Sequence, residues 1–352
     1  MSTLKKLIHK NETAWLELNS LIMDKKPSMV FVLMDENTHK QCWPLFINKI
    51  KDSTSLTPLV IPPGEEHKTI DSCLRLWEEL SIKGADRNSL LINLGGGVIT
   101  DLGGFVAATF NRGIAFVNIP TSLLAMVDAA VGGKNGIDLG PLKNQIGTIT
   151  NPEMVAVDIA FLDSLPYKHL ISGFAEMLKH GLIFSRSYWD KLKSLDFQDK
   201  ATLESLIWES IEIKNEIVAA DPFETGRRKI LNYGHTLGHA IESYFLKNQE
   251  NTLFHGEAIA IGLVLETYIS NHIMGFPQVD LEDVSRVVKN FYPKISFDEA
   301  DIKGVINLLI FDKKNRNGKV LFVLLESFGK TRMDCLADKN LIVKAFDYYE
   351  KM

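Results

Sequence analysis

The sequence predicts two domains, an α/β domain over residues 1–164 and an all-α domain over residues 165–352. Short apolar runs alternate with helical patterns as far as residue 159, which is typical of a parallel sheet flanked by helices. From about Leu165 onward, apolar residues recur every three or four positions, as they do on the buried face of a helix. A chain of 352 residues exceeds the usual size of one domain, so we interpret this change of pattern as a domain boundary.

The composition indicates a globular enzyme or binding protein. Hydrophobic residues make up 45% of the chain, and the net charge of −5 argues against nucleic acid or an anionic membrane as the main partner. The three cysteines, Cys42, Cys73 and Cys335, lack C-x2-C spacing, which indicates a reducing compartment and excludes a metal site built from cysteine. The first 18 residues lack the apolar core of a signal peptide, and no apolar run reaches spanning length, so we expect a cytoplasmic protein.

The first predicted strand covers residues 28–35 and ends in Asp35. Ligands of open parallel sheets bind at the carboxyl ends of the strands, where an acid often holds a ribose hydroxyl. An exposed acid in a loop is an equally good interpretation of Asp35 taken alone. Residues 58–68 indicate a second strand that runs into a turn, and an amphipathic helix follows through residues 74–80.

A third predicted strand, residues 89–94, leads into Gly95, Gly96 and Gly97 and then into the start of a helix that contains Asp101. Glycines at this position let the backbone approach a pyrophosphate, whose charge is met by the N–H groups at the amino end of the helix. The motif differs from the G-x-G-x-x-G fingerprint, so the prediction depends on the order of strand, glycines and helix.

Residues 115–122 indicate a strand and a turn, and the segment that follows is rich in polar groups. Asp128 comes first, Lys134 follows two glycines, and Lys143 and Asn144 lie in a second predicted loop. Lysines and backbone amides in loops suit a phosphate group. Ordinary solvated lysines are the alternative interpretation.

Three histidines and one glutamate in the helical domain have the pattern of a metal site. His235 and His239 lie one turn apart if their segment is helical, His255 follows, and Glu176 lies in another predicted helix. Imidazole is a common metal ligand, and a catalytic divalent metal typically takes three protein ligands and keeps one position open. Buried core histidines or helix caps are the alternative interpretation. Glycines beside the histidines favour the close approach of a ligand over plain packing.

The second domain carries apolar residues at helical spacing over residues 170–184, 203–218, 238–244 and 258–272. Its other notable polar residues are Lys214, Glu224, Arg227, Arg228, Asn232, Lys313 and Lys314. Arg228 precedes Asn232 by one helical turn, so we expect the two on one face. An apolar run over residues 320–325 indicates a late strand whose partner the sequence does not identify.

Because it contains these motifs, the sequence resembles the sugar-phosphate cyclases, and among them most closely the 3-dehydroquinate synthases of the shikimate pathway. The resemblance covers nearly the whole chain. The motifs that carry it are Asp35, Gly64 to Lys68, Gly95 to Asp101, Asn111 to Gly113, Asp128 to Lys134, Lys143-Asn144, Ser172 to Lys179, Arg228 to His239, and His255 to Glu257.

The resemblance implies an NAD-binding domain followed by a metal-binding domain that holds zinc or cobalt, in a homodimer. It implies a lyase that converts 3-deoxy-arabino-heptulosonate 7-phosphate into 3-dehydroquinate and phosphate during aromatic amino acid biosynthesis. In such enzymes an alcohol is oxidised, phosphate is eliminated next to the resulting ketone, hydride returns from NADH, and an aldol step closes a carbocycle.

The resemblance also implies roles for individual residues. The metal ligands are Glu176, His235 and His255, so His239 instead faces the substrate phosphate. The other phosphate contacts are Lys134, Asn144, Asn232, a lysine of the pair Lys313 and Lys314, and Arg112 from the partner subunit. The substrate carboxylate is held by Lys214 and Arg228, and the substrate hydroxyls by Asp128, Lys179 and Glu224. The contacts to NAD are Asp35, Glu65, Lys68, Gly96, Gly97, Asp101, Thr121, Ser122, Lys134, Lys143 and Phe161.

Three positions depart from the family pattern: Asn135 and Ser122, where threonine is common, and His169, where glutamate is usual near the NAD pocket. We expect these departures to alter affinities and not the reaction. The runner-up interpretation is a metal-dependent alcohol or glycerol dehydrogenase, which would carry a metal aspartate in place of Glu176 and lack cations around a phosphate. A nucleotide-binding regulator without catalysis is a further alternative. Such a protein would have lost one of the metal ligands or one of the lysines of the site, and the sequence retains these residues.

Overall fold

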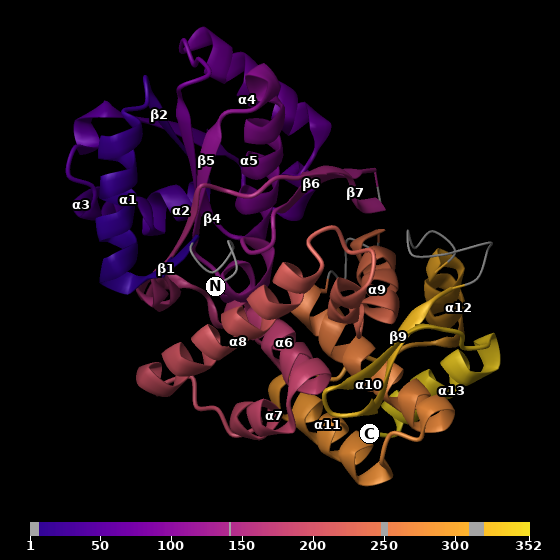
Figure 1. Ribbon diagram of the computed structural model, residues 1–352. Helices are drawn as coiled ribbons and strands as arrows, with labels where there is room; N and C mark the ends of the chain where they lie inside the picture. The colour runs from indigo at the N-terminus through magenta and orange to yellow at the C-terminus, as the bar shows by residue number, and fades with distance from the viewer. Residues whose placement is uncertain (1–6, 141, 248–252, 310–319) are drawn as a thin grey trace. The chain divides into compact units, whose positions relative to one another are not determined.

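The computed structural model describes residues 7–140, 142–247, 253–309 and 320–352, and the chain forms two compact units (Figure 1). The first unit comprises Met1–Leu170 together with Lys214–Ala219, and the second comprises Ile171–Ile213 and Ala220–Met352. A parallel sheet with helices in the first unit and a helical second unit confirm the predicted fold class.

The first unit is built on a six-stranded sheet in the order β1-β8-β5-β4-β2-β3, and every pair of neighbours is parallel. The strands are β1 (Ile8–Lys10), β2 (Val30–Asp35), β3 (Leu56–Ile61), β4 (Leu90–Gly95), β5 (Ala115–Pro120) and β8 (Met154–Val157). The inner strands are buried and largely apolar because helices cover both faces of the sheet. The apolar patterns predicted all of these strands except β1, whose three residues are too few to show a period.

Helices α1 and α3 lie on one side of this sheet, and α4 and α5 lie on the other (Figure 1). The helices of the unit are α1 (Asn11–Lys25), α2 (Glu36–Gln41), α3 (Trp43–Lys49), α4 (Ile70–Ile82) and α5 (Gly97–Thr109). Phe31 and Leu33 of β2 share one core with Leu76 of α4 and Leu102 of α5. This packing fixes where α5 begins relative to the end of β4.

The lysine-rich segment after β5 is a hairpin, and the prediction of a loop around Lys143 and Asn144 was wrong. Strands β6 (Lys134–Leu139) and β7 (Leu142–Ile149) pair in antiparallel fashion. Asn135 holds the open end of the hairpin, because its Nδ2 donates to the carbonyls of Gly133 (3.0 Å) and Thr150 (2.9 Å). The loop interpretation relied on the glycines and polar residues of this segment, but backbone pairing between the two strands decides the local structure here.

The second unit consists of helices and one β-hairpin. Its helices are α6 (Tyr167–Phe184), α7 (Arg186–Leu192), α8 (Lys200–Ala220), α9 (His235–Lys247), α10 (His255–Met274), α11 (Gln278–Phe291), α12 (Glu299–Leu308) and α13 (Lys339–Glu350), with α6 and α8 running into the first unit. The four helices predicted from periodicity correspond to α6, α8, α9 and α10. The predicted late strand is β9 (Phe322–Ser327), and its partner is β10 (Lys330–Cys335).

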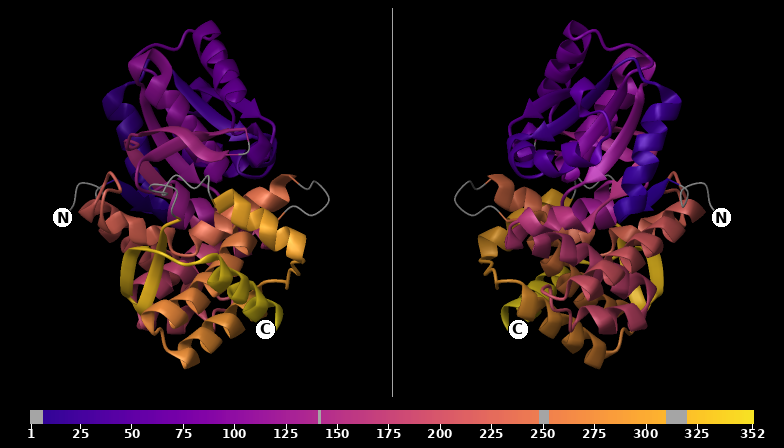
Figure 2. Two further views of the ribbon diagram at one scale, coloured as in Figure 1. Left: turned by 90° about the vertical axis from the view of Figure 1, so that its right-hand side faces the viewer. Right: turned by 90° about the vertical axis from the view of Figure 1, so that its left-hand side faces the viewer.

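Helix α10 is the central element of the second unit. It is buried on most of its surface and packs against α9, α11, α13 and β9. Figure 2 shows the C-terminal part of this unit, with α13 and the β9–β10 hairpin in yellow. A helix that is apolar all round belongs in a core. None of the helices in the described part of the chain is both long and apolar enough to cross a membrane.

Candidate functional site

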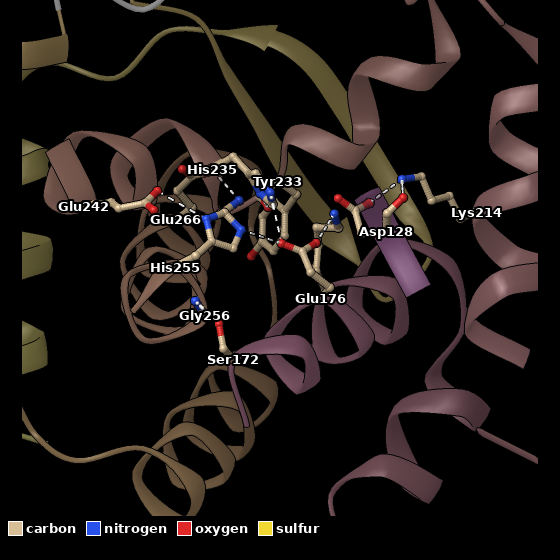
Figure 3. Close-up of polar contacts among 12 residues, drawn as sticks. Asp128, Ser172, Glu176, Lys214, Tyr233, His235, Glu242, His255, Gly256 and Glu266 are labelled. Atoms are coloured by element: carbon tan, nitrogen blue, oxygen red, sulfur yellow. Dashed lines mark hydrogen bonds and ion pairs between the residues drawn. The ribbon is translucent and has the colours of Figure 1, made fainter. Parts of the chain in front are cut away.

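Glu176, His235 and His255 come together in the second unit, each from a different helix (Figure 3). One donor atom from each of the three lies within 4.8 Å of the others. The Nε2 atoms of His235 and His255 lie 3.2 Å and 3.1 Å from the same oxygen, Oε1 of Glu176. One carboxylate and two imidazoles are a suitable donor set for a catalytic divalent metal.

Glu176 is fully buried on α6, and its second oxygen pairs with Lys179 one turn further along the helix. Burial alone would raise the pKa of Glu176, but Lys179 and His235 hold this pKa well below its ordinary value. The carboxylate is therefore ionised at neutral pH and able to act as a metal ligand.

His235 is the first residue of α9, and the backbone just before the helix fixes its ring. Its Nδ1 lies 3.0 Å from the carbonyl oxygen of Tyr233. A carbonyl can only accept a hydrogen bond, so Nδ1 carries the proton and donates it. Burial lowers the pKa of His235, although Glu176 opposes this effect. The ring is therefore neutral, and its Nε2 has a lone pair directed at the carboxylate.

His255 begins α10 and lies between two carboxylates. Its Nδ1 is 3.2 Å from Oε2 of Glu242, and its Nε2 faces Glu176. Burial would lower the pKa of His255, but Glu242 and Glu176 raise it to about 10. The position therefore favours a positive charge, whether a proton or a metal ion supplies it.

Sequence reasoning missed Glu242, although the sequence contains a signal for it. Glu242 follows His235 by seven residues and His239 by three, so all three lie along one face of α9. The prediction for this face of the helix extended only from His235 to His239. Extending the stripe by one more turn reaches the carboxylate.

The ring of His239 lies close to the other two histidine rings, with centroid distances of 5.0 Å to His235 and 5.8 Å to His255. His239, Glu242 and His255 form a second set of donors that could hold an ion. The set with Glu176 has both Nε2 atoms aimed at one carboxylate oxygen. The predicted choice of ligands thus agrees with the geometry but stays a prediction.

A buried carboxylate, Glu266 of α10, supports the start of α9. Its two oxygens accept from the backbone N–H groups of Gly234 (2.8 Å) and Leu237 (3.0 Å). The first N–H groups of a helix lack partners within the helix, so this pair of bonds satisfies two of them. Next to it, the hydroxyls of Tyr233 and Thr267 lie 2.6 Å apart. These bonds hold the turn that carries His235 against α10.

Helices α6 and α10 also make direct contact next to the donor set. The backbone N–H of Gly256 donates to the hydroxyl of Ser172 at 2.9 Å (Figure 3). A Cβ on Gly256 would lie 2.2 Å from the carbonyl oxygen of Ser172, so a residue without a side chain is required here. This close approach brings His255 beside Glu176.

Of the residues predicted around the substrate carboxylate and hydroxyls, Glu224 and Arg228 lie in the segment just before α9. Arg228 is 2% exposed, and its Nη1 donates to the carbonyl of Pro222 at 2.7 Å. Asn232 donates from Nδ2 to Oε1 of Glu224 at 2.8 Å. The segment Arg227–Asn232 is a 3-10 helix with three residues per turn, so the prediction that Arg228 and Asn232 share one face was wrong.

The cations predicted around a phosphate are described in part. Lys134 begins β6 and Arg112 lies just after α5, and both side chains are exposed in this chain. Lys313 and Lys314 lie outside the described residues.

In the first unit, the predicted phosphate-binding loop joins β4 to α5. Gly96 is the residue before the helix, and no acidic residue occupies the first turn of α5. A Cβ on Gly96 would come within 3.2 Å of Oγ of Ser122, so this loop packs closely against the turn after β5. Thr121 in that turn donates its backbone N–H to the carbonyl of Gly95 at 3.0 Å. The amino end of α5 thus suits an anion.

The buried Lys68 joins three of the residues that the resemblance assigns to NAD, which are Glu65, Asp101 and Lys143, to Asn144. Nζ of Lys68 donates to Asp101 Oδ2 and Asn144 Oδ1, both at 2.6 Å. Lys143 pairs with Glu65 at 3.1 Å. Burial would lower the pKa of Lys68, but Asp101 and Glu65 raise it above its ordinary value. The network ties the β6–β7 hairpin to α5.

The remaining predicted residues of the first unit also have defined contacts. Lys214, on the part of α8 that belongs to this unit, lies with Nζ 2.7 Å from Oδ1 of Asp128 (Figure 3). Phe161 is buried with its ring 6.1 Å from that of Trp15. His169 is exposed on the first turn of α6.

Asp35 lies at the carboxyl end of β2, as predicted, and it also begins α2. Its Oδ1 accepts from the backbone N–H of Thr38 at 2.8 Å, so the side chain caps the helix. Its assignment to a ribose hydroxyl stays a prediction.

Comparison with known proteins relates both units to one family. Residues 58–172 match the family model described as 3-dehydroquinate synthase N-terminal, and residues 173–315 match the one described as 3-dehydroquinate synthase C-terminal. The 3-dehydroquinate synthase of Parabacteroides distasonis is 43% identical over 338 residues, which cover 95% of each chain. The resemblance inferred from the motifs is confirmed.

Solved structures with lower identity share the fold. A 2-deoxy-scyllo-inosose synthase complexed with carbaglucose-6-phosphate, NAD+ and Co2+ is 24% identical with a TM-score of 0.82, covering 97% of this chain and 96% of its own. The 2-epi-5-epi-valiolone synthase of Streptomyces hygroscopicus, with NAD+ and Zn2+ bound, is 21% identical with a TM-score of 0.85, covering 98% and 96%. Family models that match most of the chain and a relative 43% identical along nearly its whole length show that this protein belongs to the 3-dehydroquinate synthase family.

Proposed function

We propose that the protein is a 3-dehydroquinate synthase that uses NAD and a divalent metal. It converts 3-deoxy-arabino-heptulosonate 7-phosphate into 3-dehydroquinate and phosphate in the shikimate pathway. The observation that carries the proposal is the arrangement of Glu176, His235 and His255 in a chain of this family. The Nε2 atoms of the two histidines lie 3.2 Å and 3.1 Å from Oε1 of Glu176.

The metal is zinc or cobalt, and we assign it to Glu176, His235 and His255. The fit rests on the state of the donors: a buried ionised carboxylate, a neutral ring with its Nδ1 proton held by a carbonyl, and a second ring that favours positive charge at its place. Three protein ligands leave coordination positions open for substrate oxygens.

NAD is assigned to the loop between β4 and α5, with its pyrophosphate at the amino end of α5. The absence of acidic side chains from the first turn of α5 and the close backbone at Gly96 support this fit. Asp35 and the network around Lys68 would then contact the rest of the dinucleotide. The full set of proposed NAD contacts is Asp35, Glu65, Lys68, Gly96, Gly97, Asp101, Thr121, Ser122, Lys134, Lys143 and Phe161.

The chemistry supplied by bound NAD would be the acceptance and return of a hydride, and that supplied by the metal would be acidification of the substrate alcohol. The chain supplies the positive and polar groups for the leaving phosphate. We assign this role to Lys134, Asn144, Asn232 and His239, because elimination places charge on the phosphate oxygens.

The substrate carboxylate is assigned to Arg228 and Lys214, and the substrate hydroxyls to Asp128, Lys179 and Glu224. Arg228 can make two parallel hydrogen bonds to a carboxylate, which selects against sugars that lack the acid group. We further propose a cytoplasmic homodimer in which Arg112 reaches the phosphate of the partner's substrate.

A turnover assay tests the proposal against the alcohol dehydrogenase alternative. Purified protein with zinc, substoichiometric NAD and 3-deoxy-arabino-heptulosonate 7-phosphate should release phosphate over many turnovers without a steady rise in NADH absorbance. NADH that accumulates in step with substrate loss, with no phosphate released, would contradict the proposal and favour a dehydrogenase.

A further inference from the structure

The carboxylate of Glu242 faces the side of the His255 ring that points away from Glu176. Glu242 is 5% exposed on α9, and its Oε2 lies 3.2 Å from Nδ1 of His255 on α10. The opposite nitrogen, Nε2, lies 3.1 Å from Glu176 (Figure 3). Each nitrogen of this ring therefore has its own acidic neighbour, and the two neighbours come from different helices.

A neutral imidazole carries one proton, on either Nδ1 or Nε2, and the nitrogen without the proton can bind a metal. An ionised carboxylate only accepts hydrogen bonds. With Glu242 at Nδ1, the neutral ring keeps its proton there and presents the lone pair of Nε2 beside Glu176. Without Glu242, the proton can move to Nε2 or the ring can rotate by 180°. Neither form presents the lone pair of Nε2 to a metal beside Glu176.

His235 offers a comparison within the same donor set. Its Nδ1 is held by the carbonyl oxygen of Tyr233, a backbone group that no side-chain substitution removes. The two rings thus share one arrangement: Nδ1 faces a hydrogen-bond acceptor, and Nε2 faces Glu176. They differ in the holding group, which is backbone for His235 and a side chain for His255.

We propose that Glu242 is a positioning residue for the metal, acting through His255 by fixing its proton on Nδ1 and its orientation. The inference rests on the metal site of the proposed function. Partners of this kind raise the basicity of the ligand, and their loss typically weakens metal binding by about 10- to 100-fold.

The test measures zinc affinity by chelator competition on purified full-length protein, with Glu242→Gln and Glu242→Leu. We expect Glu242→Leu to bind zinc about 10- to 100-fold more weakly. Glu242→Gln should lose at least about threefold, because its amide oxygen still accepts from Nδ1 but lacks the charge. Thermal unfolding of the metal-free proteins measures any effect on the fold separately.

Glu257→Gln is the matched control. Glu257 lies two residues after His255, and its carboxylate accepts from the backbone N–H of Phe254 at 2.9 Å, so this change removes a nearby charge without touching Nδ1. Its zinc affinity should stay within about twofold of the wild type.

Two results would overturn the inference: zinc affinity of Glu242→Gln within about twofold of the wild type, or an equal loss in Glu257→Gln. The first result comes from Glu242→Gln, whose side chain has nearly the same shape as that of the wild type. It therefore decides the question even if Glu242→Leu does not fold. A wild-type protein that binds no zinc would instead overturn the metal of the proposed function and this inference with it.

Discussion

Gly256 donates its backbone N–H to the hydroxyl of Ser172 at 2.9 Å, at a point where a Cβ would lie 2.2 Å from the Ser172 carbonyl oxygen. The contact joins α10 to α6 one residue from His255.

We expect Gly256→Ala to lower the free energy of unfolding by about 1–3 kcal/mol, because the atoms in the way are backbone and the helices must separate. Chemical denaturation measures this loss. Ser172→Ala removes the hydrogen bond without adding atoms and should cost about 1 kcal/mol. A Gly256→Ala variant as stable as the wild type would contradict the prediction, because it would show that α6 and α10 accommodate a Cβ at this position.

His235→Ala should abolish both stoichiometric zinc and turnover, because it removes one of the three proposed ligands. Metal content of the dialysed protein is the direct measurement. His272→Ala is the control, since His272 is an exposed histidine on α10 whose Nδ1 lies 3.0 Å from the carbonyl of Tyr268. Unchanged zinc content in His235→Ala would show that the assigned ligands are wrong.

Glu266→Gln should destabilise the protein by about 1–3 kcal/mol, because an amide offers one acceptor where the carboxylate accepts from both Gly234 and Leu237. One buried N–H would then face the amide nitrogen. Urea denaturation checks the prediction against Glu282→Gln, a change at an exposed glutamate on α11. Equal stability of the two variants would contradict the role of Glu266 as the cap of α9.

Arg228→Ala should lower kcat/KM at least tenfold, since an unmade hydrogen bond to a charged group costs roughly 1.5–3 kcal/mol. Steady-state kinetics with the carboxylated substrate provides the measurement. The neighbouring Arg227 is exposed, so Arg227→Ala should keep the wild-type value. Loss of folding in Arg228→Ala is recognised by circular dichroism, and a folded variant with unchanged kcat/KM would remove Arg228 from the site.

A fifth prediction concerns pH. Asp283 on α11 is buried and accepts from Nε1 of Trp189 at 2.9 Å and from Arg286. Burial would raise the pKa of Asp283, but the bonds from Trp189 and Arg286 lower it below its ordinary value.

Because the folded pKa lies below the unfolded one, the stabilisation by Asp283 is present above about pH 4 and is lost as the pH falls through the folded value. Asp283→Asn should therefore be less stable than the wild type at pH 7, and the difference should shrink toward pH 3. Denaturation at both pH values measures it, with the exposed Asp347→Asn as the control. A difference that stays constant with pH would contradict the prediction.

The sequence predicted the parts of the molecule whose signals are local. The strand before Gly95 and the helix after it were predicted because a buried apolar run and a glycine-rich turn are contiguous. Glu176, His235 and His255 were brought together by a family resemblance and not by spacing. The distance between α6 and α10 along the chain leaves no local pattern that would place them side by side.

Other features were missed for identifiable physical reasons. Glu266 lies within a long apolar stretch, and its role depends on backbone N–H groups of another helix, which have no signature in side chains. The β6–β7 hairpin was missed because its strands contain glycines and polar residues and β7 is largely exposed, so no apolar run marks either strand. The 3-10 geometry of Arg227–Asn232 was also missed, because residue types and spacing alone do not distinguish three residues per turn from 3.6.

Glu176 and His255 are 79 residues apart along the chain, yet their side chains are in contact. An ion bound to both would close a loop of that length, as a disulfide does, and would remove extended conformations from the unfolded chain. For a loop of this size the entropic effect is worth roughly 4 kcal/mol in the simplest treatment. The ion would then be a reversible cross-link, so a shortage of metal in the cell would shorten the lifetime of the folded protein as well as stop its chemistry.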